Sequence, residues 1–175
     1  PFYNKPDQRM QLAHFTAIAE EGGLPVVVYN VPGRTSANME ADTFLRLAEH
    51  PGIVAVKEAS ANLDQIAQIC RGVPDGVSVL SGDDAWTLAL MAMGGHGVIS
   101  VCSNEIPGEM AELCAAAAAG DFATALELFQ ITHDLGIPRE RMAEWLKPLI
   151  TRPKPAAEPP ASAIPAGGES TERDG

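Results

Sequence analysis

Lys57 is the residue of this sequence whose type and position best suit covalent chemistry. It ends the apolar run IVAVK at 53–57, and strand alternation predicts that it shares a face with Ile53 and Ala55. An apolar setting disfavours the ammonium form of a lysine, and the neutral amine can attack a carbonyl carbon. The position is compatible with a nucleophilic amine, although a lysine at a strand end more often reaches solvent or pairs with a carboxylate.

A phenol and a guanidinium follow the preceding apolar run, in YNVPGRT at 29–35. Tyr29 can relay protons to and from a carbinolamine, and the turn at Pro32 and Gly33 directs Arg34, whose planar fork suits a substrate carboxylate. Taken singly, Tyr29 is an ordinary core aromatic and Arg34 an ordinary loop charge. Together with Lys57 they form a more specific pattern.

Other reactive residue types have simpler explanations. The acidic pair at 83–84 directly follows Gly82 and begins a helix-length segment, so N-capping explains the pair and no metal is predicted. His96 precedes an apolar run, whereas Tyr29 and Lys57 end theirs. If the fold is a barrel, His96 should therefore lie at its bottom face, remote from the site. Cys102 and Cys114 are predicted to be ordinary buried thiols.

Short β-branched runs alternate with helix-length segments along the chain. Four almost continuously apolar runs predict strands that are buried on both faces, at 25–29, 53–57, 77–81 and 97–101. The segments predicted as helices are 7–21, 39–50, 63–71, 83–93, 105–119 and 122–133. Such alternation requires parallel strands joined by crossovers, in either an open doubly wound sheet or a (β/α)8 barrel.

The placement of glycines and of reactive side chains favours the barrel. The glycine-rich stretch 94–97 comes before a strand, whereas a dinucleotide-binding sheet needs its glycine-rich turn after one. Tyr29, Lys57 and the SGDD turn at 81–84 instead follow strands, which is where a barrel places its active site. We therefore predict an α/β fold of the (β/α)8 TIM-barrel type, of which four strand–helix units form roughly half.

Composition limits the partners and the compartment. The chain has 175 residues, 46% of them hydrophobic, and a formal net charge of -11, which suits one core and disfavours nucleic acid and anionic lipid as partners. Its three cysteines are odd in number and lack C-x-x-C spacing, so a reducing cytoplasm is expected. The longest apolar stretch, 88–101, is interrupted by glycines and a histidine, so no membrane span is predicted.

Both ends of the chain differ from its middle. PFYNKP at 1–6 is a turn-like opening without an initiator Met, so we expect an upstream portion. We predict a half-barrel with the start of a helical extension over 1–135 and a short helix over 136–150. The stretch 151–175 is rich in Pro, Ala, Gly and charge, and it is predicted to be disordered because it has few apolar residues to offset ordering entropy.

Four motifs resemble those of one enzyme superfamily. YNVPGRT at 29–35, KEAS at 57–60, SGDD at 81–84 and GGHGVISV at 94–101 resemble the dihydrodipicolinate synthase and N-acetylneuraminate lyase superfamily, in register from residue 1 to about residue 130. The resemblance implies a TIM barrel of which this chain carries the second half. From about Ile131 onward the sequence is expected to depart from the family's helical extension.

The resemblance also implies roles for the candidate residues. Lys57 would form a Schiff base with pyruvate without any cofactor, and Tyr29 would relay protons. Tyr3, in PFYNKP, would complete the relay of a neighbouring subunit across the interface of a homo-oligomer, a dimer or tetramer. Gly82 and the carbonyl of Ile99 would help to form the substrate pocket.

Arg34 bears on the second substrate. Arginine in this motif is typical of the synthase branch, where it holds the carboxylate of aspartate semialdehyde. The implied reaction condenses pyruvate with L-aspartate 4-semialdehyde to 4-hydroxy-tetrahydrodipicolinate, in lysine and diaminopimelate biosynthesis. Two alternatives stay open: another pyruvate aldolase, of the N-acetylneuraminate lyase or keto-deoxy sugar acid type, and a non-catalytic remnant without the upstream threonine relay.

Overall fold

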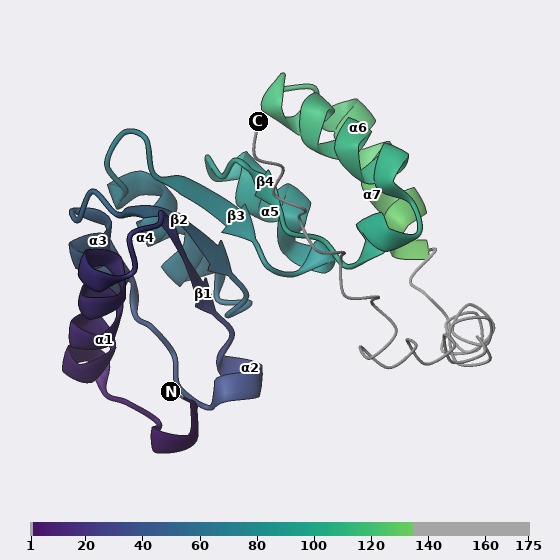
Figure 1. Cartoon of the computed structure of the whole chain (residues 1–175). Coiled ribbons are helices and arrows are strands. Elements are labelled where there is room, and N and C mark those ends of the chain that lie inside the picture. Colours follow the sequence, from purple (N-terminus) through teal and green to yellow (C-terminus); the bar gives the residue numbers. More distant parts are fainter. Residues whose placement is uncertain (1, 135–175) are drawn as a thin grey trace, which may run out of the picture. The chain divides into compact units, whose positions relative to one another are not determined.

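The computed structural model describes residues 2–134, which form one α/β unit (Figure 1). Its strands are β1 (Val26–Asn30), β2 (Ile53–Glu58), β3 (Ser78–Ser81) and β4 (Gly97–Val98). Its helices are α1 (Gln8–Glu21), α2 (Pro32–Thr35), α3 (Ala41–Ala48), α4 (Leu63–Gly72), α5 (Thr87–Ala92), α6 (Pro107–Ala118) and α7 (Phe122–Asp134). Single 3-10 turns lie at Phe2–Asn4, Asp84–Trp86 and Cys102–Asn104. Strands and helices alternate from α1 to α6, as predicted.

The four strands are parallel and pair in chain order, β1-β2-β3-β4. A doubly wound sheet reverses its strand order at a switch point, whereas a barrel adds each strand beside the previous one. The strand order therefore favours the barrel, which the alternation of elements in the sequence could not do by itself.

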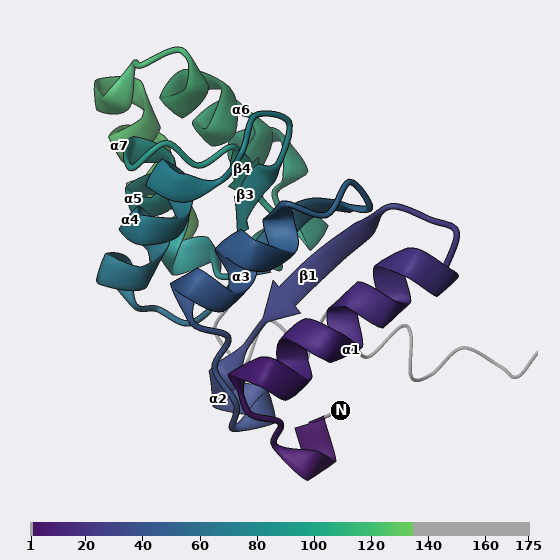
Figure 2. The same ribbon diagram turned by 90° about the vertical axis from the view of Figure 1, so that its left-hand side faces the viewer.

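One face of the sheet packs against helices and forms the core. Val28, Val56 and Val79 occupy the same face of successive strands and are fully buried. They belong to one cluster with side chains from the helices, of which the largest are Phe44, Leu47, Ile66, Ile69 and Leu90. Figure 2 shows α1 running alongside β1. Each fully buried side chain of this kind contributes about 1.5–3 kcal/mol, so this face holds the strands in their positions.

β2 contains one residue more than its pairing with β1 requires. Val26 pairs with Ile53 and Val27 pairs with Ala55, so Val54 has no partner position in β1. An extra residue of this kind changes the phase of the alternation. Ile53 therefore packs in the helix-side core, and the prediction that it shares a face with Lys57 is wrong. Ala55, two residues before Lys57 and beyond the irregularity, does share that face.

The opposite face of the sheet is largely uncovered by the described residues. It carries Val27 and Tyr29 on β1 and Lys57 on β2, and alternation places Ile99 on it just beyond β4. Val27 and Tyr29 expose 45% and 43% of their surfaces. In a complete barrel this face is the interior, which is filled by side chains from all the strands.

Two predicted elements have different ends in the structure. The predicted helix at 83–93 is divided into the 3-10 turn Asp84–Trp86 and the short helix α5. The predicted strand at 97–101 has only two residues, Gly97–Val98. The strand is short because the N–H groups of Val101 and Cys102 donate to Asp84 Oδ2, over 3.0 and 3.1 Å, and the chain turns there.

The predicted short helix at 136–150 and the predicted disordered tail at 151–175 lie outside the described residues, and both stay predictions. Of the helices that the structure describes, none is both long enough and apolar enough to cross a membrane.

Candidate active site

Parallel pairing places Tyr29 and Lys57 side by side at the carboxyl ends of β1 and β2. The two residues are partners in the ladder, and Lys57 is in turn paired with Leu80 on β3. The Lys57 Nζ atom lies 4.3 Å from the centroid of the Tyr29 ring, where an ammonium group is attracted to the ring face. Both side chains are partly exposed on the uncovered face. The predicted nucleophile and the predicted proton relay therefore adjoin each other.

Gly82 lets β3 approach the stem of Lys57. A Cβ atom at this position would lie 2.8 Å from the Ala59 Cβ atom, and 3.1 and 3.2 Å from the Cγ and Cε atoms of Lys57. The Gly82 N–H group donates to the carbonyl oxygen of Glu58 over 2.7 Å and holds the strand end there. Gly82 therefore shapes the space around the lysine, and its contact with a substrate stays a prediction.

Asp84, which follows the carboxyl end of β3, is hydrogen-bonded to the segment after Ile99. The Ile99 N–H group donates to the Ser81 carbonyl oxygen over 2.9 Å, which continues the ladder past β4. Asp83 caps its turn as predicted, because its Oδ1 atom accepts the Ala85 N–H group over 3.1 Å. Asp84 lies in the first turn of the same element, as predicted, and its Oδ2 atom in addition accepts the N–H groups of Val101 and Cys102. Ile99 is thus anchored on both sides at the edge of the site.

Arg34 lies on α2, directly after β1. This short helix has Pro32 at its first turn, and its last cap residue, Ser36, has a φ of 54°, in the left-handed region. Figure 1 shows α2 at the carboxyl end of β1, the end that carries Tyr29. The Arg34 side chain is exposed. It therefore belongs to the same edge of the sheet as Lys57, in keeping with a role toward a substrate carboxylate.

Tyr3 lies in the 3-10 turn Phe2–Asn4, before α1. Its side chain is 88% exposed. A relay across a subunit interface requires such an accessible phenol. The assignment of Tyr3 to that relay stays a prediction.

A buried polar network lies behind Tyr29 and Lys57 and was not predicted from the sequence. The residues that follow them, Asn30 and Glu58, are also paired, and their side chains lie on the helix side of the sheet with 4% and 2% of their surfaces exposed. The Asn30 Nδ2 atom donates to Glu58 Oε2 over 3.0 Å. A signal was available in the sequence: Tyr-Asn and Lys-Glu each end a strand, and alternation sends the second residue of each pair into the helix layer.

The thiols of the described unit have raised pKa values. Burial, followed by the charge of Asp84, raises the pKa of Cys102 to about 11. Burial also raises the pKa of Cys70 and of Cys114. Since the thiolate is the reactive form, none of these three cysteines is a candidate nucleophile, and Lys57 stays the leading one.

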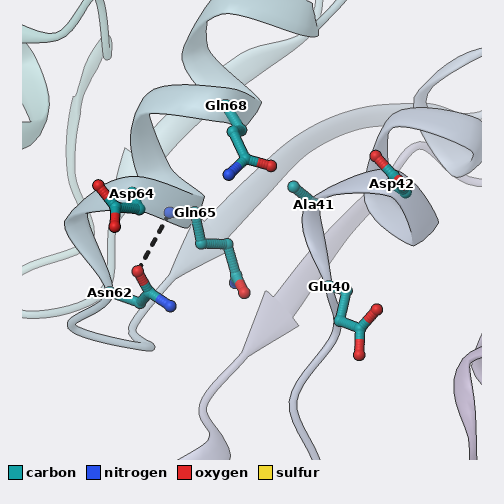
Figure 3. A pocket seen from close by; sticks show the side chains of 7 residues that line it. All are labelled: Glu40, Ala41, Asp42, Asn62, Asp64, Gln65 and Gln68. Carbon is teal, nitrogen blue, oxygen red and sulfur yellow. Dashed lines mark hydrogen bonds between the residues drawn. The ribbon is translucent and has the colours of Figure 1, made fainter.

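A polar hollow of about 240 Å³ lies elsewhere, between the starts of α3 and α4 (Figure 3). Its lining includes the carboxylates of Glu40, Asp42 and Asp64, and Lys57 is not among its residues. Within residues 2–134, no group of three or more His, Cys, Asp or Glu side chains is arranged to hold a metal ion. The hollow is therefore separate from the candidate active site, and the expected independence from metals stays a prediction.

The strand order, with parallel strands added one beside the next, defines the class of α/β-barrel proteins. The model of the Dihydrodipicolinate synthetase family matches residues 1–146, and the chain belongs to this family. The match extends well past Ile131, so the expected departure from the family pattern near that residue was placed too early.

Curated relatives share the sequence over half of their own length. The chain is 56% identical over 128 residues to the 4-hydroxy-tetrahydrodipicolinate synthase of Koribacter versatilis, covering 73% of this chain and 43% of that one. It is 44% identical over 168 residues to the synthase of the same name from Neisseria gonorrhoeae, covering 96% and 54%. The chain thus spans about half the length of the relatives it matches.

Solved structures share the fold over a similar part. The dihydrodipicolinate synthase of Aquifex aeolicus has a TM-score of 0.75 at 46% identity, covering 77% of this chain and 46% of that one. The enzyme of Cyanidioschyzon merolae with lysine bound has a TM-score of 0.76 at 41% identity, covering 85% and 53%. The chloride-inhibited enzyme of Acinetobacter baumannii, complexed with pyruvate, has a TM-score of 0.75 at 36% identity, covering 86% and 53%. The described unit is therefore part of a TIM barrel.

Proposed function

We propose that this chain supplies the lysine nucleophile of a class I lyase that condenses pyruvate with L-aspartate 4-semialdehyde to 4-hydroxy-tetrahydrodipicolinate. The observation that carries the proposal is the position of the Lys57 Nζ atom, 4.3 Å from the centre of the Tyr29 ring, at the ends of paired strands. The names of the curated relatives support the synthase reaction over the lyase and sugar-acid alternatives. The place of this reaction is the biosynthesis of lysine and diaminopimelate.

The first half of the reaction needs an amine and a proton relay. The neutral Lys57 amine attacks C2 of pyruvate; the nitrogen then loses a proton and the former carbonyl oxygen takes one up, which gives a carbinolamine. We assign to the Tyr29 phenol, whose ring adjoins Lys57, the delivery of a second proton to that hydroxyl group, which leaves as water as the imine forms. Loss of a proton from C3 then gives the enamine. The protonated imine is itself the electron sink, so the proposal includes no cofactor.

The second half of the reaction needs a site for a carboxylate-bearing aldehyde. The enamine carbon attacks the aldehyde carbon of the semialdehyde, whose oxygen takes up a proton. The amino group of the semialdehyde part then attacks C2 of the resulting imine, which closes the ring and releases the Lys57 amine. We assign the carboxylate of this substrate to Arg34, because its exposed guanidinium follows β1 at the edge that carries Lys57. Ile99 and Gly82 border the same region and would limit the size of the pocket.

A homo-oligomer in a reducing cytoplasm is part of the proposal. One related structure, 36% identical, is described as the first monomeric dihydrodipicolinate synthase variant, which supports an oligomer as the usual state of the family. The exposed Tyr3 phenol is assigned to the interface. The three cysteines are free thiols, as a reducing compartment requires.

Reductive trapping tests the nucleophile. Borohydride added in the presence of pyruvate should convert the imine to a stable secondary amine on Lys57, because only an imine is reduced in this way. Mass spectrometry of a digest would locate the adduct. The peptide that carries Lys5 is an internal control, since that lysine precedes α1 and lies outside the site. A folded sample without an adduct, or with equal labelling of both lysines, would contradict the assignment.

A further inference from the structure

A buried carboxylate lies directly behind the candidate active site. Glu58 follows Lys57 on β2 and, with 2% of its surface exposed, projects into the helix layer. Its Oε1 atom accepts the Ser60 N–H group, and its Oε2 atom accepts the side-chain amides of Asn30 and Gln65, over 2.6, 3.0 and 3.3 Å. None of these three donors carries a charge. The carboxylate is thus held by neutral N–H groups alone among the hydrogen bonds described for it.

The Asn30 amide connects this carboxylate to β1. Its Nδ2 group donates to Glu58 and, over 2.9 Å, to the Asn38 side chain, while its Oδ1 atom accepts the Met39 N–H group over 3.0 Å. Asn30 and Glu58 are ladder partners, one residue beyond the pair of Tyr29 and Lys57. The hydrogen bond therefore joins the two strands at the point where the reactive side chains leave them.

A second layer fixes the Asn30 and Glu58 side chains from the helix side. The Asn38 Nδ2 group donates to Gln65 Oε1 over 2.8 Å, and the Gln65 Nε2 group donates to the Met39 carbonyl oxygen over 3.1 Å. Asn38 and Met39 belong to the segment between α2 and α3, and Gln65 belongs to α4. The network thus ties the segment after Arg34 and the start of α4 to the same carboxylate.

Stability alone is a weak explanation for this arrangement. A buried carboxylate loses its hydration, and well-packed apolar residues in its place are often as stabilising or more so. The two preceding ladder positions on the same face, Val28 and Val56, are apolar. The next ladder pair on this face, Asn30 and Glu58, is polar instead. It adjoins the pair of Tyr29 and Lys57, whose relative position matters most for the proposed reaction.

We propose that Glu58 is a positioning residue: through Asn30 it locks the ends of β1 and β2 and so holds the Lys57 amine against Tyr29 for attack on pyruvate. The inference rests on the proposed function, because it assigns Glu58 to the reaction of Lys57. A carboxylate is required because every partner is a donor. Glu58→Gln would turn one acceptor into a donor that faces the Asn30 and Gln65 amides, and the strand ends would separate or shift.

The test compares the rate of imine formation on Lys57 between variants of the full-length protein. Reductive trapping over a time course measures this rate. In Glu58→Gln the maximum rate should fall by about 10- to 100-fold, as expected for a slightly misplaced nucleophile. The pyruvate concentration for half-maximal rate should change by less than about threefold, because pyruvate contacts are retained. Asn30→Asp should also be slow, since two carboxylates would then face each other.

Exchanging the carboxylate and the amide between positions 58 and 30 should restore part of the rate of imine formation. In the double variant Asn30→Asp with Glu58→Gln, the position 30 carboxylate can accept from the new amide, so a donor again faces an acceptor. We expect the double variant to be faster than either single variant. Ile69→Val is the matched control, because it loosens the same core without touching the network. Equal rate losses in Glu58→Gln and Ile69→Val, or a double variant as slow as the slower single one, would overturn the proposal.

Amide hydrogen exchange separates this proposal from the proposed function. The Ala59 N–H group donates to the Asn30 carbonyl oxygen over 2.9 Å, and the Gly82 N–H group donates to the Glu58 carbonyl oxygen, so both report on the strand ends. Both amides should exchange faster in Glu58→Gln than in Ile69→Val. If pyruvate is not trapped on Lys57 in the parent, the proposed function fails, and unchanged exchange in Glu58→Gln would independently overturn the role of Glu58.

Discussion

The Cys102 thiol lies next to the Asp84 carboxylate, which also binds the backbone N–H group of Cys102. Asp84 Oδ2 accepts the Cys102 N–H group over 3.1 Å. Burial is the larger cause, and the Asp84 charge the next, of the rise in the pKa of this thiol to about 11. At pH 8 the group is therefore almost entirely the unreactive thiol, in keeping with the prediction of an ordinary cysteine.

Asp84→Asn should make Cys102 more reactive toward an alkylating reagent. A neighbouring negative charge destabilises the thiolate, so its removal lowers the pKa and raises the thiolate fraction at a given pH. Each unit by which the pKa falls increases the alkylation rate at pH 8 by about 10-fold. Peptide mass spectrometry over a time course measures this rate for each cysteine.

Cys114 is the internal control for this experiment. The pKa of its thiol is raised by burial, without a contribution from Asp84. Its alkylation rate should therefore stay the same in Asp84→Asn. A parallel increase at both cysteines would show that the substitution had opened the fold, and no increase at Cys102 would mean that the Asp84 charge does not act on it.

At the scale of elements, the close approach of β3 to β2 depends on Gly82. A methyl group there would meet the Ala59 Cβ atom at 2.8 Å and the Lys57 stem at 3.1 Å. We expect Gly82→Ala to reduce the free energy of unfolding by about 1–3 kcal/mol, because an overfilled contact forces the strand ends apart. Denaturant unfolding measures the stability, and reductive trapping measures the accompanying loss at Lys57.

Gly108→Ala provides a matched substitution in another element. Gly108 lies in the first turn of α6, and a Cβ atom there would meet nothing within 4 Å. Alanine is the better helix former, so this change should leave stability unchanged or raise it slightly. If Gly82→Ala and Gly108→Ala lower the free energy of unfolding equally, an overfilled contact between β3 and β2 is not the cause of the loss.

The order and type of the elements could be predicted because each is encoded locally. Strands appear as apolar runs and helices as longer amphipathic segments, and these patterns need no information about distant residues. The length of β4 could not be predicted in this way, because the Asp84 side chain, far from it in sequence, takes the N–H groups of Val101 and Cys102. The extra residue in β2 was also missed, since an uninterrupted apolar run hides a change of phase.

The candidate site was predictable only on the face of the sheet that carries Tyr29 and Lys57. Tyr29 and Lys57 end successive strands, and parallel pairing brings such residues together. The network around Glu58 was missed because a Lys-Glu pair at a strand end is most simply explained as surface charge. Its partners Asn38 and Gln65 come from separate segments, and no local pattern links them.

For the whole molecule, we expect the 175-residue chain prepared alone to self-associate and to condense its substrates poorly. The described sheet leaves an apolar face with Val27 and Tyr29 about half exposed, and β1 and β4 are its edges. Association hides such surfaces from water. Sedimentation velocity would measure the size distribution, and a monodisperse monomer with full synthase activity would contradict the expectation.

Two substitutions identify the surface through which the chain self-associates. Val27→Glu places a charge on the uncovered face and should shift the chain toward smaller species. Leu24→Glu is the matched control, because Leu24 is also an exposed apolar residue but precedes β1. An equal effect of both substitutions would point to general solubility rather than to the sheet face.

The chain-order pairing of the strands also determines how this unit can fold. β1, β2, β3 and β4 begin at residues 26, 53, 78 and 97, and each of the last three pairs with the strand synthesised immediately before it. The loops that must close are short, and contact order is low for a parallel sheet. During synthesis the sheet can therefore grow vectorially, with each finished strand serving as the template for the next to leave the ribosome.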